Sequence, residues 1–140
     1  MPELNIVEKV IVLEAVELLQ NLSPEQLARI ASIAREVNYP PDKPILDPVQ
    51  PADALYVIVD GAVEIRRNGE ALATAHRNEV LGAWALFDED PLPVTAATLE
   101  DTKLLRIARE DFYDLLSDNA EITAAIFSTL VKRFRKLVEK

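Results

Sequence analysis

Three stretches of this 140-residue chain decide its fold: LYVIVDGAVEI at residues 55–65, GAWAL at residues 82–86 and PLPVT at residues 91–95. The first stretch is rich in β-branched and aliphatic residues, which is typical of strands. Asp60-Gly61 interrupts it, and such a pair favours a two-residue turn. We therefore expect residues 55–65 to form two strands of a β-hairpin.

Further strand signals lie on both sides of these stretches. Leu72–Ala75 and Lys103–Ala108 are short apolar runs, and Asn68-Gly69 is a second turn signal. Residues 39–51 hold five of the nine prolines, so we expect short edge segments and turns there. Many short strands with close turns favour a small antiparallel roll or barrel.

A helix-start motif occurs before this β-rich region. Ser23 can cap a helix, Pro24 suits the first helical position, and Gln26 completes a capping box. Apolar residues then recur at helical spacing, namely Leu27, Ile30, Ala31 and Ala34. The pattern predicts a helix that packs by one face.

The chain returns to helical periodicity after the last strand signal. We predict a short helix over Asp111–Leu116, and Asn119 as the cap of a longer one that begins near Ala120. The longer helix carries an apolar stripe of Phe127, Leu130, Phe134 and Leu137, widened by Ile126, Val131 and Val138. Two heptads are too few to identify a coiled coil. Packing on the same chain and homodimerisation through this helix both remain open.

The three opening stretches together resemble the cyclic-nucleotide-binding domain family, the catabolite-activator-like sensor domains. Members of that family carry Gly-Glu-x-Ala-Leu followed by Pro-Arg-x-Ala-Thr. The resemblance extends over roughly Val7 to Lys136. It implies an α+β, mainly β fold, in which an antiparallel jelly-roll β-roll is flanked by N-terminal and C-terminal helices. We expect a single domain over 1–140, with helices in 1–37, the roll in 38–108 with a short helix near 83–87, and helices in 109–140.

The same resemblance indicates where a ligand would bind. The site comprises Gly82, Ala83, Trp84, Ala85, Leu86, Leu92, Pro93, Val94 and Thr95. In relatives, backbone N–H groups after Gly82 face the cyclic phosphate, and the position of Thr95 often supplies a hydroxyl. This chain has Ala83 where the family has the ribose-binding glutamate, and Leu92 where it has the phosphate-binding arginine. We interpret the segment as a vestigial phosphate cassette.

The chemistry of these replacements is unfavourable for an anionic ligand. A leucine cannot provide the charged fork that arginine offers to a phosphate. Asp88, Glu89 and Asp90 precede Leu92 and would repel an anion. Trp84 either fills the cavity of the purine or stacks on a planar ligand. Replacement cations would have to come from Arg66, Arg67 or Arg77.

These observations predict a non-enzymatic regulatory or protein-interaction module that does not bind cAMP or cGMP in the usual way. The alternative is a small-molecule or cyclic-nucleotide sensor with an altered pocket. A catalytic or metal site is not expected, because the chain has one histidine (His76), no cysteine, and serines in helical contexts. We expect no cofactor, with cAMP or cGMP retained as a minor candidate ligand.

Charge and composition restrict the partners. The net charge is −9, and five of the 15 basic residues lie in 132–140, so the body is acidic. An acidic body argues against nucleic acid, and no DNA-binding domain follows the long helix in this sequence. Apolar runs are too short for a signal peptide or membrane span. We expect a cytoplasmic protein that works through a protein partner or a fused effector domain. Homodimerisation through Phe127, Leu130, Phe134 and Leu137 is one of the two alternatives left open for the long helix.

Overall fold

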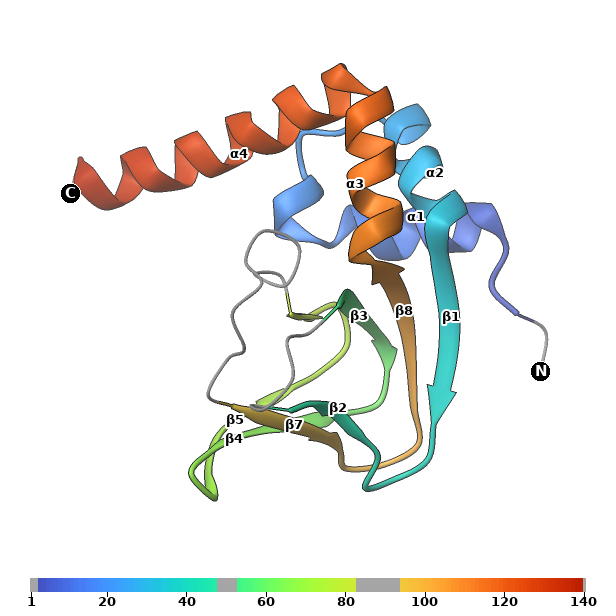
Figure 1. The fold of residues 1–140 in the computed structure, drawn as a ribbon, viewed down its shortest axis with the longest axis vertical. Coiled ribbons are helices and arrows are strands. Elements are labelled where there is room, and N and C mark those ends of the chain that lie inside the picture. Colours follow the sequence, from blue (N-terminus) through green and yellow to red (C-terminus); the bar gives the residue numbers. More distant parts are fainter. Residues whose placement is uncertain (1–2, 48–52, 83–93, 140) are drawn as a thin grey trace.

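The computed structural model describes residues 3–47, 53–82 and 94–139. In these ranges two four-stranded antiparallel sheets face each other, with helices gathered at one end (Figure 1). The helices are α1 (Ile6–Glu14), the 3-10 helix η1 (Glu17–Leu19), α2 (Pro24–Ile33), α3 (Arg109–Asp118) and α4 (Ala120–Val138). The strands are β1 (Ala34–Tyr39), β2 (Pro44–Leu46), β3 (Ala54–Asp60), β4 (Val63–Arg67), β5 (Glu70–Ala75), β6 (Val80–Leu81), β7 (Thr95–Thr98) and β8 (Thr102–Ala108). The predicted α+β roll with flanking helices is confirmed.

The two sheets have different surroundings. Sheet A has the strand order β1-β8-β3-β6, and sheet B has the order β2-β7-β4-β5. On β3, Leu55 and Val57 face the helices and join one core, whereas Tyr56 and Ile58 face sheet B and join a second core. A strand between two cores is apolar on both faces, which explains the unbroken hydrophobic run of residues 54–59.

Two local predictions are confirmed, the capping box by its hydrogen bonds and the hairpin turn by its backbone angles. The Ser23 hydroxyl accepts a hydrogen bond from the Gln26 N–H, and the Gln26 side chain accepts one from the Ser23 N–H. Asn68 and Gly69 have φ of 52° and 81°, and β4 and β5 pair on either side of them. Both residues therefore adopt the left-handed conformations that a tight hairpin turn requires.

The hairpin predicted at Asp60-Gly61 is wrong. β3 pairs with β8 and β6, whereas β4 pairs with β5 and β7, so the turn carries the chain from sheet A to sheet B. Gly61 has φ of 112°, and a Cβ there would lie 2.7 Å from the Thr102 Cα. The glycine is needed because the chain passes directly against the start of β8.

The first sheet begins earlier than predicted. α2 ends at Ile33, and Ala34, expected on the helix, is the first residue of β1. The expected boundary between helices and roll at residue 38 thus falls inside a strand. β1 pairs with β8 from Ala34 to Tyr39, and this long-range pairing overrides the local helical periodicity. The short helix expected near 83–87 lies outside the described residues.

Of the three predictions about α4, one is confirmed and two are wrong. α4 begins at Ala120, as predicted, but the Asn119 side chain makes no capping bond to it. Its Nδ2 instead donates to the Leu115 carbonyl at the end of α3 (2.8 Å). Ile126 does not widen the exposed stripe, because it is buried against the body together with Ile122 and Thr129. These three residues follow helical spacing and define the inward face of α4.

Candidate functional site

In chain order, the predicted phosphate cassette connects a strand of sheet A to a strand of sheet B. It begins after β6, the edge strand of sheet A, and ends at β7 in sheet B. Ala83, Trp84, Ala85, Leu86, Leu92 and Pro93 lie outside the described residues. The structure therefore positions the predicted site through its two ends, Gly82 and Val94-Thr95.

The entry to the segment is held firmly by β3. Leu81 is buried and pairs with Tyr56, and the Ile58 N–H donates to the Glu79 carbonyl (3.0 Å). Gly82 follows with φ of 76°, in the left-handed region that favours glycine. This backbone turn is the part of the family motif that the described structure retains at the entry.

At the exit from the segment, two side chains are buried and the one between them is exposed. Val94 and Ala96 are buried, and Ala96 belongs to the core between the sheets. Thr95 is exposed and lies directly opposite Arg66 on β4. Because neighbouring strand residues point to opposite faces, the Thr95 hydroxyl lies on the outer face of sheet B. A role for this hydroxyl toward a ligand inside the roll is therefore not supported by its position.

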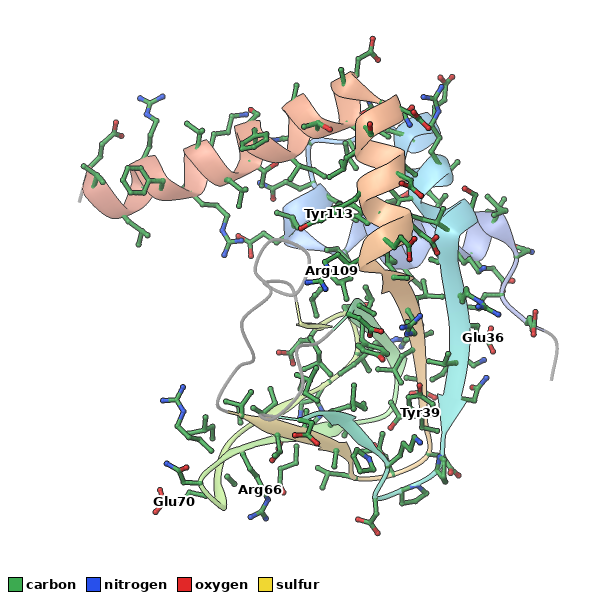
Figure 2. The ribbon with its side chains drawn as sticks, in the orientation of Figure 1. Glu36, Tyr39, Arg66, Glu70, Arg109 and Tyr113 are labelled. Atoms are coloured by element: carbon green, nitrogen blue, oxygen red, sulfur yellow. The ribbon has the colours of Figure 1, made fainter. Side chains whose placement is uncertain are left out.

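The proposed replacement cation Arg66 is engaged elsewhere. Its Nε lies 2.5 Å from Glu64 Oε1, and its Nη1 donates to the Gly69 carbonyl (2.7 Å). Figure 2 shows Arg66 and Glu70 at the end of the roll far from the helices. Arg67 and Arg77 are also exposed. The described contacts hold Arg66 on the outer surface, away from the core between the sheets.

A polar cluster at the rim of sheet A was missed by sequence reasoning. Arg106 on β8 lies directly opposite Tyr56 on β3, and its Nη2 lies 3.2 Å from Asp53 Oδ1. Tyr56 shares its face with Ile58, so Arg106 also lies on the face toward sheet B. The sequence signal was present: Arg106 interrupts the otherwise apolar run of β8 from Leu104 to Ala108.

The titration of this cluster reflects its partial burial. Burial raises the pKa of Tyr56 above its usual value, although the hydrogen bond with Arg106 opposes the shift. Burial alone would lower the pKa of Arg106, but the hydrogen bond with Tyr56 and the charge of Asp53 outweigh it and raise that pKa. Arg106 is thus a fixed cation at the edge of the core between the sheets.

The exposed face of α4 is the other candidate site. Phe127, Leu130, Phe134 and Leu137, the residues of the predicted stripe, are all exposed, as are Val131 and Val138. The C-terminal part of α4 extends away from the rest of the molecule (Figure 1). The buried face of the helix instead contacts η1 and the segment after it, where the Asn21 amide bonds to the Thr129 hydroxyl. Within the described residues, the chain itself does not cover the stripe.

The family model for the cyclic nucleotide-binding domain matches residues 36–119. The chain belongs to this family. The match includes all of the roll from the second half of β1 and ends at the junction of α3 and α4. The predicted family membership is thereby confirmed.

Several relatives extend the likeness. The N-terminal domain of a transcriptional regulator from Streptomyces coelicolor A3(2) is 28% identical, with a TM-score of 0.82 over 91% of this chain and 92% of that one. The catabolite activator protein of Thermus thermophilus is 29% identical, with a TM-score of 0.70 over 86% and 59% of the two chains. A cAMP-dependent protein kinase regulatory subunit from Aspergillus niger is 30% identical over 112 residues, 79% of this chain and 27% of the relative.

The chain corresponds to only part of the length of several relatives. It spans about a quarter of the fungal kinase regulatory subunits, which have 27% of their length matched. The named relatives are regulatory subunits and transcriptional regulators, and what this chain shares with them is the cyclic nucleotide-binding domain. None of the helices in the described ranges has the length and apolar character needed to cross a membrane.

Proposed function

We propose that this domain is a regulatory, non-enzymatic protein-interaction module that does not bind cAMP or cGMP in the usual way. The observation that carries the proposal is the pair of replacements in the cassette. Ala83 stands where the family has a glutamate, and Leu92 stands where it has an arginine. Neither replacement can form a charged hydrogen bond with a cyclic nucleotide.

The expected loss of affinity is large. A hydrogen bond to a charged group contributes roughly 1.5–3 kcal/mol, so losing two costs about 3–6 kcal/mol if they add. At about 1.4 kcal/mol per tenfold change in affinity, this corresponds to about two to four decades. A site of micromolar affinity would then be unoccupied at ordinary cellular concentrations.

The contacts of Arg66 on β4 also support the proposal. Arg66 is the arginine nearest to the exit of the cassette in strand register, since it lies opposite Thr95. Its guanidinium is bound to Glu64 and to the Gly69 carbonyl on the outer face. Moving it to a ligand would break both contacts.

Calorimetry with cAMP and cGMP tests the proposal directly. The wild type is compared with an Ala83→Glu/Leu92→Arg double variant, which restores both family residues. Binding by the double variant alone is expected, since it returns both the ribose acceptor and the phosphate cation. Micromolar binding by the wild type would refute the proposal, and an altered-pocket sensor would then become the favoured reading.

The partner of this module, we further propose, is a second copy of the chain, which would pack against the exposed face of α4. The stripe has a heptad pattern: Phe127 and Phe134 occupy equivalent positions, as do Leu130 and Leu137. Val131 and Val138 follow each leucine and widen the apolar face. An isologous two-fold interface would cover the same residues in both copies.

The charges of α4 are arranged compatibly with such a pairing. Lys132, Arg135 and Lys136 lie off the apolar stripe by helical geometry. Arg133 lies beside the stripe, but its Nε forms an ion pair with Glu17 Oε1 of η1 (3.3 Å). The cation nearest to the proposed interface is therefore neutralised within its own chain.

Sedimentation equilibrium of the wild type and a Phe134→Glu variant tests the dimer. Because Phe134 is 65% exposed, the substitution leaves the folded monomer intact, while it places a charge in the centre of the interface. We expect a dimer for the wild type and a monomer for the variant. Ser128→Glu, on an exposed position off the stripe, is the matched control and should remain dimeric. A monomeric wild type would refute this part of the proposal.

A further inference from the structure

Two arginines lie side by side on the face of sheet A that is directed toward sheet B. Arg35 on β1 and Arg106 on β8 are direct partners in the antiparallel register. Arg106 is in turn the partner of Tyr56 on β3. Directly opposite residues share a face and have Cβ atoms about 4.5–5.5 Å apart, so the three side chains form one row across three strands.

The row lies at the border of the apolar core. The next row along the sheet consists of Val37, Leu104 and Ile58, which pack in the core between the sheets. Arg35 is exposed, the Arg106 side chain is 26% exposed, and Tyr56 is buried. The arginines thus stand at the rim, with their charges accessible from solvent.

The positive charge of the two arginines exceeds the negative charge of the carboxylates that lie near them. Like charges directly opposite on neighbouring strands are destabilising. Asp53 pairs with Arg106, but its side chain is 74% exposed, and such exposed pairs contribute little. Among the residues that the structure describes, no carboxylate lies within ion-pair distance of Arg35.

Glu36, the acidic residue next to Arg35 in the sequence, does not form an ion pair with it. Glu36 follows Arg35 on β1 and therefore points to the opposite face, where it accepts from the Leu4 N–H (2.8 Å) (Figure 2). Its other oxygen lies 3.9 Å from Lys103 Nζ. These contacts hold Glu36 on the helix side of the sheet, away from the arginine pair.

We propose that Arg35 and Arg106 bind a phosphate group at the rim of sheet A, beside Tyr56 in the same cross-strand row. Two guanidinium groups offer parallel donors to one tetrahedral dianion, which accepts bidentate hydrogen bonds from arginine. When the phosphate binds, it replaces the exposed Asp53 carboxylate as the ion-pair partner of Arg106. The site is built from residues of β1, β8 and β3 that are not part of the predicted cassette, and it would be a second input to the proposed regulatory module. The phosphate belongs either to a small molecule or to a phosphorylated side chain of a partner.

Amide and arginine Nε chemical shifts during titration with inorganic phosphate test the site. For the wild type we expect saturable shifts centred on Arg35, Arg106 and Tyr56. Arg35→Glu should abolish them, because a cross-strand carboxylate then occupies Arg106. Lys132→Glu makes the same change in net charge on α4 and should bind phosphate with an affinity within about twofold of the wild type, since the two exposed sites are screened from each other.

A stability measurement separates ligand binding from a merely structural role. In the absence of phosphate, Arg35→Glu should unfold at a higher temperature than the wild type, because it replaces a repulsion by an attraction. Phosphate should then raise the unfolding temperature of the wild type but not that of the variant. Absence of saturable shifts in the wild type, or shifts that persist in Arg35→Glu, would overturn the proposal.

A phosphoserine peptide and its unphosphorylated form distinguish the two sources. If the phosphopeptide binds the row more tightly than inorganic phosphate, and the unphosphorylated form does not bind, the phosphate comes from a modified partner protein. If both phosphates bind equally, a small phosphate-bearing molecule is the ligand. Both results require the Arg35→Glu variant to lose binding.

Discussion

The side-chain amide of Asn21 donates a hydrogen bond to the Thr129 hydroxyl over 2.7 Å, joining residues 108 positions apart in the chain. Thr129 is fully buried, and its hydroxyl in turn donates to the Ala125 carbonyl (3.2 Å). The bond lies at the point where α4 leaves the body. Together with the burial of Ile122 and Ile126, it helps to fix which face of the helix is covered and which is left exposed.

Replacing Thr129 by valine should destabilise the domain by about 1–2 kcal/mol, because the Asn21 amide loses its acceptor while the shape is kept. Urea unfolding measures the change. Ser128→Ala, one residue earlier and exposed, should change stability by less than about 0.5 kcal/mol. Equal stability of Thr129→Val and the wild type would show that the bond does not anchor α4.

The two glycines of the turns should respond very differently to alanine. At Gly61 a Cβ would lie 2.5 Å from Thr102 Oγ1 and 2.8 Å from the Asp101 carbonyl, whereas at Gly69 nothing lies within 4 Å. We expect a loss of about 2–5 kcal/mol for Gly61→Ala, from strain and overlap together. Gly69→Ala should lose about 1–2 kcal/mol, from its left-handed backbone alone. Thermal unfolding of both variants gives the comparison, and similar losses would contradict the close approach.

The acid sensitivity of the fold should depend on Glu36. The hydrogen bond from Asn38 and the Leu4 N–H, with smaller contributions from Lys103 and Lys9, hold the pKa of Glu36 below its ordinary 4.5, against the effect of burial. A lowered folded-state pKa stabilises the native state above pH 4.5, and this contribution is lost as the pH falls through the lowered value. Asn38→Ala removes the largest cause, so it should reduce the acid-dependent loss of stability. Unfolding between pH 2 and 7 tests this, and an unchanged pH profile would contradict it.

At the alkaline end, Tyr56 should contribute in the opposite direction. Burial raises its pKa above 10.0 in the folded state, so the unfolded chain releases the phenolic proton first. The stabilisation by the neutral phenol is present below pH 10 and is lost as the pH rises through the raised value. A Tyr56→Phe variant should lack this part of the alkaline decline. Stability profiles from pH 8 to 12 provide the measurement, and since the other tyrosines are common to both proteins, identical declines would count against the assignment.

The sequence predictions that were confirmed depend on interactions between residues that are close together in the chain. The capping box of Ser23, the turn at Asn68-Gly69 and the start of α4 depend on residues within a few positions of one another. The prediction at Asp60-Gly61 was wrong because the same dipeptide can join strands of one sheet or of two. Strand partners distant in sequence decide between these outcomes, and the dipeptide contains no information about them.

By itself, the sequence indicated the family, the α+β roll, the approximate positions of several strands and helices, and Ala83 and Leu92 at two positions where the family resemblance implies charged residues. These features depend on residue identity and local spacing, which a single chain displays directly. The tertiary structure alone decided that Thr95 faces outward, that Ile126 is buried while Phe127 is exposed, and that Arg35 lies beside Arg106. Each of these depends on which strands and helices pack together, and that choice follows from the summed burial and hydrogen bonding of the whole fold.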